Sequence, residues 1–377
     1  MAIMTFRDRA LTPIWAKIER GERLSLEDGL ALYATPDIIG LGRMAHAVQR
    51  RWSGDAVYFV LNQKIEHTNV CVLSCKFCDF AAKKGAPGAY EMTSQEILAR
   101  LTPEIKEVHI TGGMPPDWPW ERYLDIVQTI HRHLPDADVK AFTAVEIDFF
   151  HKKFKMPIEE VLRQLKEAGV RTMPGGGAEV FSERVRKQLF NQKIGAKGWL
   201  DVHKAAHRLG IPTNSTLLYG HIETLEDRLE HLQMLRDLQD ETGGFLAYIP
   251  LAYHPDDNEL GRELKRQGTA TTGWDDLKQL AVGRLFLDNF QHVKSHWIMV
   301  SQGLSQVALH YGVNDLEGTV VREKIYHAVG AHTPQAMTLD AILTLIRGAG
   351  KVPAERDSFY RILRTEFDPA SVPAGAV

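Results

Sequence analysis

The chain has 377 residues, of which 44% are hydrophobic and 25% are charged. Its 45 Lys and Arg residues nearly balance its 48 Asp and Glu residues, which argues against the basic surface of a nucleic-acid-binding protein. No apolar run approaches the roughly 18 residues of a membrane span, and the first residues lack a secretory signal, so we expect a cytoplasmic protein without membrane insertion.

The first 55 residues have helical character, and short apolar runs then alternate with longer amphipathic ones. Apolar, β-branched runs of this length are typical of buried parallel strands. Apolar residues at Tyr123, Val127, Ile130 and Leu134 follow the spacing of one helix face. The predicted strands are Ala56–Ile65, Val108–Thr111, Val139–Thr143, Val170–Met173, Thr213–Tyr219, Phe245–Leu251 and Val293–Val300, with an eighth within Gly312–Thr319.

Seven or eight repeats of strand and helix predict an α/β fold, and at this length a closed (β/α)8 TIM-type barrel is favoured. A doubly wound open sheet is the alternative. We expect a helical N-terminal extension at residues 1–55, the barrel at 56–320 and a helical C-terminal extension at 321–377.

Three cysteines, Cys71, Cys75 and Cys78, are the only ones in the chain, and all lie in the segment CVLSCKFC. Closely spaced thiolates select zinc or an iron–sulfur cluster. A cubane cluster takes one cysteine per iron, so three cysteines leave one iron open for chemistry. The odd number of cysteines argues against a disulfide framework. A zinc site completed by His67, in a non-enzymatic binding protein, is the structural alternative.

Parallel barrels place their active sites at the carboxyl ends of the strands. The cysteine segment follows the first predicted strand directly, so the metal ligands are expected at this end. Polar and glycine residues gather at the other strand ends. They are Glu66, His67, Gly112, Gly113, Glu146, Gly175, Gly176, Gly177, Glu179, Gly220, His221, His254, Ser301 and Gln302.

The CxxxCxxC motif after the first strand, with Phe77 before the last cysteine, resembles the radical S-adenosylmethionine (SAM) superfamily. This resemblance implies a [4Fe–4S] cluster on the three cysteines, with the amino and carboxylate groups of SAM on the fourth iron. One electron from the cluster then cleaves SAM into methionine and a 5′-deoxyadenosyl radical.

Residues from about Ile65 to Tyr360 resemble the menaquinone/deazaflavin branch of this superfamily. The segments that carry the resemblance are HITGG at 109–113, KAFTAVEI at 140–147, MPGGGAEVFSERVR at 173–186, LLYGHIET at 217–224 and LQDETGGFLAYIPLAYHP at 238–255. AFTAVEI and Pro250–Leu251 are similar to the aminofutalosine synthase family. The chain departs from the pattern at Met114–Pro116, where relatives often have Leu-His-Pro.

The resemblance implies a transferase reaction in the futalosine pathway of menaquinone biosynthesis. SAM, as a co-substrate, and 3-[(1-carboxyvinyl)oxy]benzoate would give 6-amino-6-deoxyfutalosine, methionine and bicarbonate. An electron donor such as flavodoxin or ferredoxin is the implied partner. The dehypoxanthine futalosine cyclase family, which would release 5′-deoxyadenosine, is the enzymatic alternative.

Several residues are candidates for contacts with SAM. Phe77 is expected to shield the cluster, and Gly112 with Gly113 resembles the motif that contacts the SAM amino group. Gly176 and Gly177 form either a plain turn or a nest of N–H groups for an anion or ribose. The remaining candidates are Glu146 and Glu179 for ribose or ammonium, Arg186 in preference to Arg184 for the carboxylate, and Tyr219, Gly220, His221 and Ile222 for adenine.

The expected substrate carries two carboxylates, which cationic or hydrogen-donating side chains recognise. The candidate catalytic residues near it are His67, His254, Lys294 and His296. For each histidine taken alone, a purely structural role is the alternative.

Overall fold

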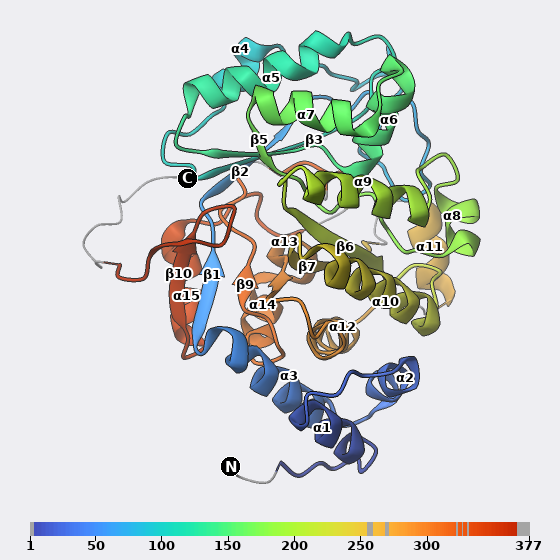
Figure 1. Cartoon of the computed structure of the whole chain (residues 1–377), viewed down its shortest axis with the longest axis vertical. Helices are drawn as coiled ribbons and strands as arrows, with labels where there is room; N and C mark the ends of the chain where they lie inside the picture. The colour runs from blue at the N-terminus through green and yellow to red at the C-terminus, as the bar shows by residue number, and fades with distance from the viewer. Residues whose placement is uncertain are drawn as a thin grey trace.

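The computed structural model describes residues 4–254, 259–267, 271–321, 323–325, 327–329 and 332–367. Eight parallel strands within these residues form the inner wall of the fold, with helices outside them (Figure 1), as expected for a (β/α)8 barrel. The strands are β2 (Asn62–Glu66), β3 (Glu107–Thr111), β4 (Asp138–Ala141), β5 (Val170–Thr172), β6 (Thr213–Tyr219), β7 (Phe245–Ala252), β8 (His292–Ser295) and β9 (Asp315–Leu316).

The barrel consists of two parallel sheets joined at two seams. One sheet has the order β2-β3-β4-β5, and the other contains β9-β8-β7-β6. A bridge between Met173 and Thr213 joins β5 to β6, and a bridge between Gln63 and Val321 joins the segment after β9 back to β2. The Asn62 side chain reinforces the second seam, because its Oδ1 accepts a hydrogen bond of 2.9 Å from the Val320 amide.

The predicted first strand, Ala56–Ile65, is two strands in the structure. β1 (Ala56–Phe59) lies between β10 (Val352–Arg356) and the barrel strand β9, and β2 begins after a break at Val60–Leu61 and pairs with β3. The chain crosses Gly318 at this break, where an added Cβ would lie 1.8 Å from the Val60 carbonyl oxygen. The break therefore depends on the backbone contact between Gly318 and Val60, which the pattern of apolar residues does not predict.

Helices cover the outside of the barrel and connect its strands (Figure 1). Thr93, Thr143 and Thr224 each begin a helix with a reciprocal capping box, so these boundaries are set by local sequence. The helices are α4 (Ser94–Leu98), α5 (Trp120–His133), α6 (Ala144–Phe154), α7 (Ile158–Ala168), α8 (Glu183–Leu189), α9 (Ala196–Arg208), α10 (Leu225–Thr242), α11 (Glu259–Gln267), α12 (Gly273–Phe286), α13 (Trp297–Val300), α14 (Gln302–Ala308) and the 3-10 turn η1 (His327–Val329).

The N-terminal extension is formed by α1 (Leu11–Glu19), α2 (Leu26–Ala34) and α3 (Ile38–Ser53). These helices lie at the lower end of the molecule in Figure 1, and α3 packs along α12. The C-terminal part contains the helix α15 (Leu339–Gly348) and two strands that were not predicted, β10 (Val352–Arg356) and β11 (Ile362–Arg364). β10 pairs in parallel with β1, and residues 368–377 of the expected extension lie outside the described residues.

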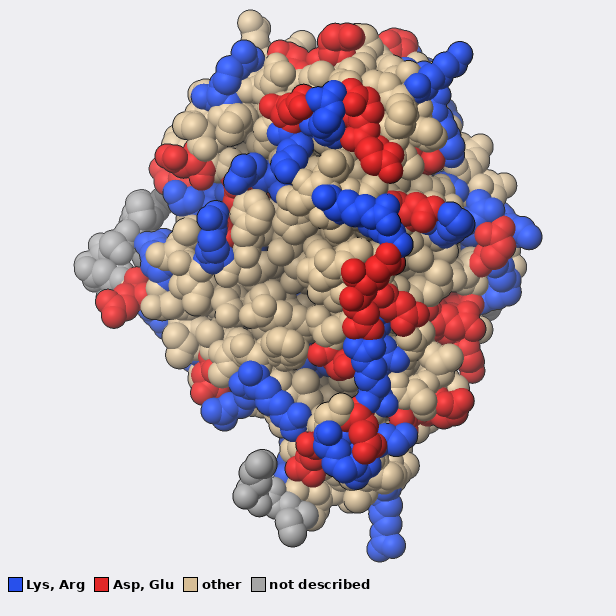
Figure 2. Space-filling model, viewed as in Figure 1, with Lys and Arg blue, Asp and Glu red and all other residues tan. Residues whose placement is uncertain are grey.

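Basic and acidic residues are interspersed on the face that Figure 2 shows, with uncharged surface between them. Within the described part of the chain, no helix is both long and apolar enough to cross a membrane.

Candidate active site

A cavity of about 290 Å³ lies inside the barrel and is reached from the carboxyl ends of the strands. Its lining comes from the cysteine segment, from the loops after β3, β4, β5 and β7, and from side chains of the strands themselves. All three cysteines line it, with Phe77, Gly112, Glu146, Gly176, Gly177, Glu179, His254, Lys294 and His296. Twelve predicted site residues thus meet at one cavity.

Backbone hydrogen bonds fix the cysteine segment at the cavity rim. The Cys71 amide donates to the Ala82 carbonyl at 3.0 Å, and the Cys78 amide donates to the Cys75 carbonyl at 3.1 Å. The Lys83 ammonium binds three successive carbonyls of this segment, the closest being that of Leu73 at 2.8 Å. The thiols are free and largely buried, so the segment presents three sulfurs to one enclosed space.

These three thiols fit the donor set of a [4Fe–4S] cluster with one open iron. No group of three or more His, Cys, Asp or Glu side chains in the described ranges is arranged around a single metal ion. A cubane cluster does not need its ligands around a single ion, because each thiolate binds a different iron. The three thiols come from one eight-residue segment and line one cavity, so they are suited to bind such a cluster.

The two glycines after β3 have different roles. Gly112 lines the cavity, and an added Cβ there would lie 2.8 Å from His67 Cε1. Gly113 does not line the cavity, because its Cα faces the start of the cysteine segment, where an added Cβ would lie 2.1 Å from the Val70 carbonyl oxygen. Gly113 therefore lets the cysteine segment pack closely on the end of β3.

Glu146 combines a structural contact with a free carboxylate oxygen. Its Oε2 accepts hydrogen bonds from the Thr143 amide at 2.7 Å and the Thr143 hydroxyl at 2.8 Å, which caps α6. Its Oε1 is buried and accepts no hydrogen bond from the described chain. Burial raises the pKa of Glu146 to about 7, although the bonds from Thr143 oppose this shift. The free oxygen is suited to an N–H or O–H donor of a ligand.

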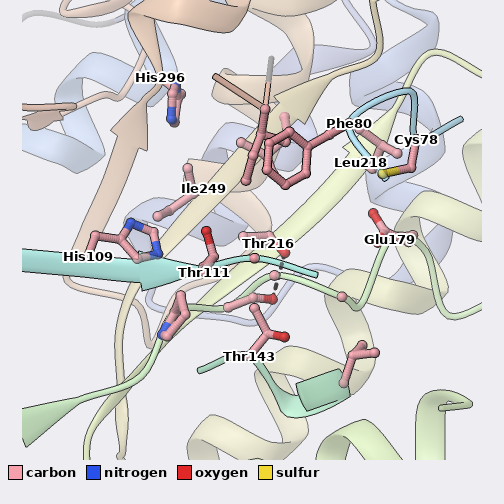
Figure 3. A pocket seen from close by; sticks show the side chains of 18 of the residues that line it. Cys78, Phe80, His109, Thr111, Thr143, Glu179, Thr216, Leu218, Ile249 and His296 are labelled. Carbon is pink, nitrogen blue, oxygen red and sulfur yellow. Dashed lines mark hydrogen bonds between the residues drawn. The ribbon is translucent and has the colours of Figure 1, made fainter. Parts of the chain in front are cut away.

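The glycine run after β5 brings backbone close to the cavity. Gly177 has a φ of +90°, and an added Cβ there would lie 2.3 Å from Val145 Cγ2. Thr216 supports the run by donating its hydroxyl hydrogen to the Gly175 carbonyl at 2.7 Å (Figure 3). Glu179, which follows, has a φ of +49°, a left-handed conformation that is uncommon for a non-glycine residue and costs free energy.

Lys193 is a cation beside the cysteines that sequence reasoning missed. Its ammonium forms an ion pair with Glu179 and lies 5.0 Å from the centre of the Phe77 ring. Burial disfavours its charge, but Glu179 and Cys75 outweigh that effect and raise the pKa of Lys193. The lysine is therefore charged and faces the same space as the thiols.

The inner end of the cavity is strongly ionic. Lys140 Nζ lies 2.6 Å from Glu107 Oε2, and Lys294 Nζ lies 3.2 Å from Glu317 Oε2. Burial opposes ionisation of Glu107, but Lys140 and other cations outweigh it and lower the pKa of Glu107 to about 2. Both lysines are thus neutralised by ionised carboxylates.

Two histidines and a further lysine share this inner end. Lys64 Nζ lies 3.3 Å from His296 Nε2. Burial, followed by Lys64 and Lys140, lowers the pKa of His109 to about 3, so this ring is neutral at pH 7. Figure 3 shows His109 and His296 at one side of the pocket and Cys78 and Glu179 at the other.

Five predicted site residues do not line the cavity, namely His67, Gly113, Arg186, Tyr219 and His221. The His67 ring is fully buried against Trp118, with ring centres 5.4 Å apart, and burial lowers its pKa to about 3. Arg186 pairs with Glu183 and donates to the Asn191 carbonyl at 2.8 Å, so it ties α8 to the following loop.

Tyr219 points away from the cavity for a different reason, and His221 lies in the turn after β6. Alternate residues of a strand face opposite sides, and on β6 it is Asn214, Thr216 and Leu218 that face inward. The Tyr219 hydroxyl therefore donates to Asp276 Oδ1 at 2.7 Å in the outer layer. The His221 ring lies 3.1 Å from the Leu218 carbonyl oxygen.

The same alternation identifies what sequence reasoning missed. Lys64 on β2, His109 on β3 and Lys140 on β4 are inward-facing residues within strands that were treated as apolar. A search for ionisable residues within each strand, and not only at its end, finds all three.

Comparison with known proteins assigns most of the chain to family models. Residues 65–235 match the model of the Radical SAM superfamily, and residues 242–367 match that of the CofH/MqnC C-terminal region. These two matches cover the barrel and much of the C-terminal part.

Curated relatives match over almost their whole length. Aminodeoxyfutalosine synthase of Thermus thermophilus is 48% identical over 95% of this chain and 97% of its own. The enzyme of the same name from Streptomyces coelicolor is 40% identical over 94% of each chain. The 5-amino-6-(D-ribitylamino)uracil–L-tyrosine 4-hydroxyphenyl transferase 1 of Methanosarcina acetivorans is 36% identical over 89% of this chain and 90% of its own.

Solved structures share the fold at low sequence identity. Methylornithine synthase (PylB) superposes with a TM-score of 0.70 at 16% identity, covering 90% of this chain and 97% of that one. The FeFe-hydrogenase maturase HydG from Carboxydothermus hydrogenoformans gives 0.69 at 16% identity, covering 93% of this chain and 80% of that one. The predicted barrel is thereby confirmed.

Proposed function

We propose a function for this cavity from one premise: the chain belongs to the radical SAM superfamily, in the group of relatives that includes the aminodeoxyfutalosine synthases. It is accordingly a radical SAM enzyme of the futalosine pathway. We infer that it joins the 5′-deoxyadenosyl part of SAM to 3-[(1-carboxyvinyl)oxy]benzoate. With one water, this gives 6-amino-6-deoxyfutalosine, methionine and bicarbonate.

One observation carries this proposal: the three cysteines, the free oxygen of Glu146 and an ionic inner end line the same cavity. Cys71, Cys75 and Cys78 would hold the cluster, which supplies the single electron that cleaves SAM when it is bound. The other residues then have to hold SAM and the substrate in place and to keep water out.

Contacts with SAM are proposed for residues at the cysteine end of the cavity. The Glu146 Oε1 atom would accept a hydrogen bond from the SAM amino group near Gly112. Lys193 takes the role expected of Arg186, since it is a cation that lies at the cysteine end of the cavity and can bind the SAM carboxylate. Glu179, beside Gly176 and Gly177, is placed to accept hydrogen bonds from the ribose hydroxyls.

Apolar side chains separate the two polar ends. Phe80, Leu218 and Ile249 line the middle of the cavity, as Figure 3 shows. They would pack on the aryl ring and exclude water and other reactants from a highly reactive radical. His254 stays a candidate for contact with the substrate, since it lines the cavity near the end of β7.

A reducing compartment suits this chain, because its three thiols must stay unoxidised until the cluster is assembled. We therefore propose a cytoplasmic location, with an electron donor of the flavodoxin or ferredoxin type as partner.

Product analysis tests the proposed function. The anaerobically reconstituted protein is incubated with a reductant, the enolpyruvyl benzoate and SAM labelled with carbon-13 in its adenosyl part, and the products are identified by mass spectrometry. We expect the label in an adduct with the aryl substrate, and no adduct from the Cys75→Ala variant. Labelled 5′-deoxyadenosine as the main product, without adduct, would instead indicate a cyclase-type hydrogen abstraction.

A further inference from the structure

We propose that Lys83 is a positioning residue for the iron–sulfur cluster: its ammonium group holds the backbone after Cys71 in a fixed shape before the cluster binds, and its charge favours reduction of the cluster. This inference rests on the proposed function, because it takes a cluster on the three cysteines as its premise. Lys83 lies outside both the CxxxCxxC motif and the cavity.

The ammonium group of Lys83 contacts the backbone carbonyls of three successive residues. Its Nζ lies 3.2 Å from the carbonyl oxygen of Cys71, 3.1 Å from that of Val72 and 2.8 Å from that of Leu73. An ammonium group has three hydrogens to donate, so these carbonyls account for all of them. Lys83 is an exposed residue, and holding it in one geometry costs side-chain freedom. The contact is therefore a specific one, unlike that of a freely moving surface lysine.

The path of the chain brings Lys83 to these carbonyls. Val70 and Ala82 form a parallel bridge. The Ala82 amide donates to the Asn69 carbonyl at 2.8 Å, and the Ala82 carbonyl accepts from the Cys71 amide at 3.0 Å. The chain after the last cysteine thus returns alongside the start of the cysteine segment, which places the next residue, Lys83, beside it.

The contact orders the part of the segment that carries the first ligand. The amides of Cys71 and Val72 are held by the Ala82 and Met114 carbonyls, while their own carbonyls are held by Lys83. Carbonyl oxygens that converge on one point repel each other, and the ammonium charge offsets this repulsion. A ligand that is already ordered loses less freedom when the metal binds, and groups behind the ligands are what keep them ordered.

The charge of Lys83 has a second effect, on the cluster itself. Three thiolates make the site negative, and reduction adds one more electron. A nearby cation therefore stabilises the reduced cluster, since net charge is one of the factors that set the reduction potential. The contacts of Lys83 within the described chain are to uncharged carbonyls, which leave its own charge in place. Other ionisable side chains around the segment include Lys76, Asp79, the pair Lys84–Asp117 and the pair Lys193–Glu179.

The test compares wild type with Lys83→Met, which removes the charge and the contact, and with Lys83→Arg, which keeps the charge. The matched control is Lys84→Met, since it removes the same charge from the next residue. Lys84 is 52% exposed and pairs with Asp117 instead of the carbonyls. The midpoint potential of the anaerobically reconstituted proteins is measured by redox titration followed by electron paramagnetic resonance, without SAM.

We expect Lys83→Met to make the cluster harder to reduce, by roughly 3- to 10-fold in the reduction equilibrium, or about 30–60 mV for one electron. The effect is modest because solvent screens an exposed charge. Lys83→Arg should keep most of the wild-type potential. A potential of Lys83→Met equal to that of wild type, or an equal shift in Lys84→Met, would overturn the proposed role of the charge.

Hydrogen exchange of the iron-free proteins tests the positioning role without any cluster. The amides of Cys71 and Val72 should exchange at least roughly fivefold faster in Lys83→Met than in wild type, because local opening becomes easier. They should exchange at the wild-type rate in Lys84→Met. Unchanged exchange in Lys83→Met would overturn the positioning role, even if this variant assembled no cluster.

Failure of the proposed function looks different from failure of this inference. A protein that forms no adduct but binds a cluster would still show the shift in potential between wild type and Lys83→Met. A wild-type protein that binds no cluster would give no signal to titrate, which contradicts the premise and not the contact of Lys83 with the segment.

Discussion

At the scale of single residues, the charge of Lys193 beside the cysteines is expected to govern SAM binding. Replacing Lys193 by Met removes this cation and leaves Glu179 without its partner. We expect SAM affinity to fall at least roughly tenfold with cluster content unchanged, because a charge-assisted contact is lost. Equilibrium dialysis of labelled SAM measures this effect. The control is Lys197→Met, whose side chain is 91% exposed and should leave affinity unchanged; equal losses in both variants would refute the assignment.

The raised pKa of Glu146 predicts that the stability of the protein without SAM depends on pH. Its pKa is about 7 in the folded chain against an ordinary value of 4.5, so the folded state binds a proton more tightly than the unfolded state does. The stabilisation that this proton provides is complete below about pH 4.5 and is lost as the pH rises through 7. Relative to Glu146→Gln, wild type should lose up to about 3 kcal/mol of unfolding free energy between pH 5 and 8.

Urea denaturation of both proteins across this pH range measures the difference, and Gln keeps the capping contact because it also suits this helix position. Saturating SAM should reduce the difference, since the ligand would give the ionised oxygen a partner. Stability curves that stay parallel across the range would show that Glu146 is not perturbed.

The predicted site residues line the cavity where the prediction used the type of residue, and several fall outside it where the prediction depended on the direction of a side chain. Cys71, Cys75 and Cys78 could be predicted because thiols are rare and their spacing is informative. Tyr219 could not be excluded as a cavity residue, because its strand was predicted without knowing which of its side chains face the inside of the barrel. The choice between Arg186 and Lys193 required the path of the loop after α8, which no local pattern in the sequence determines.

At the scale of elements, the turn after β5 is expected to tolerate no side chain at Gly177. Gly177→Ala would place a Cβ 2.3 Å from Val145 Cγ2 in a backbone conformation with φ +90°. Overlap and backbone strain together should cost about 2–4 kcal/mol of unfolding free energy and weaken SAM binding.

Two comparisons separate these causes in thermal and chemical denaturation. Gly85→Ala has a similar φ of +76° but no atom within 4 Å, so it should cost only about 1 kcal/mol. The double variant Gly177→Ala, Val145→Ala should recover part of the loss by removing the overlapping methyl group. Equal costs at Gly85 and Gly177 would show that overlap with Val145 has no role.

Elements with a local signal were predictable, and those that depend on distant contacts were not. The helices that begin at Thr143 and Thr224 have capping residues that the sequence displays. The break between β1 and β2 arises from the crossing at Gly318, more than 250 residues away along the chain. Only the folded backbone shows that contact.

At the scale of the whole molecule, the C-terminal strands are fastened to the barrel by buried charge. Arg356 on β10 is 1% exposed, and its Nη2 lies 2.9 Å from Asp315 Oδ2 on β9. Arg356→Met would leave the buried Asp315 with less compensation, and we expect a loss of about 3–5 kcal/mol of unfolding free energy. The control Arg361→Met removes a pair whose arginine is 71% exposed and should cost less than about 1 kcal/mol.

Chemical denaturation of the two variants measures this contrast, and comparable small losses would show that β10 contributes little to barrel stability.

The alternation of strands and helices predicted the barrel itself. The addition of β10 beside β1 could not be predicted, because β10 is a single short strand after α15 with no repeat around it. The domain boundaries at residues 55 and 320 stay predictions.

The claim on which the whole account depends is that three cysteines hold a four-iron cluster whose fourth iron is open to SAM. Electron paramagnetic resonance of the reduced, anaerobically reconstituted protein, measured with and without SAM, tests it most directly. We predict a [4Fe–4S] signal that changes shape when SAM is added and that is lost in Cys75→Ala. A colourless zinc protein, or a cluster signal that SAM leaves unchanged, would contradict the account.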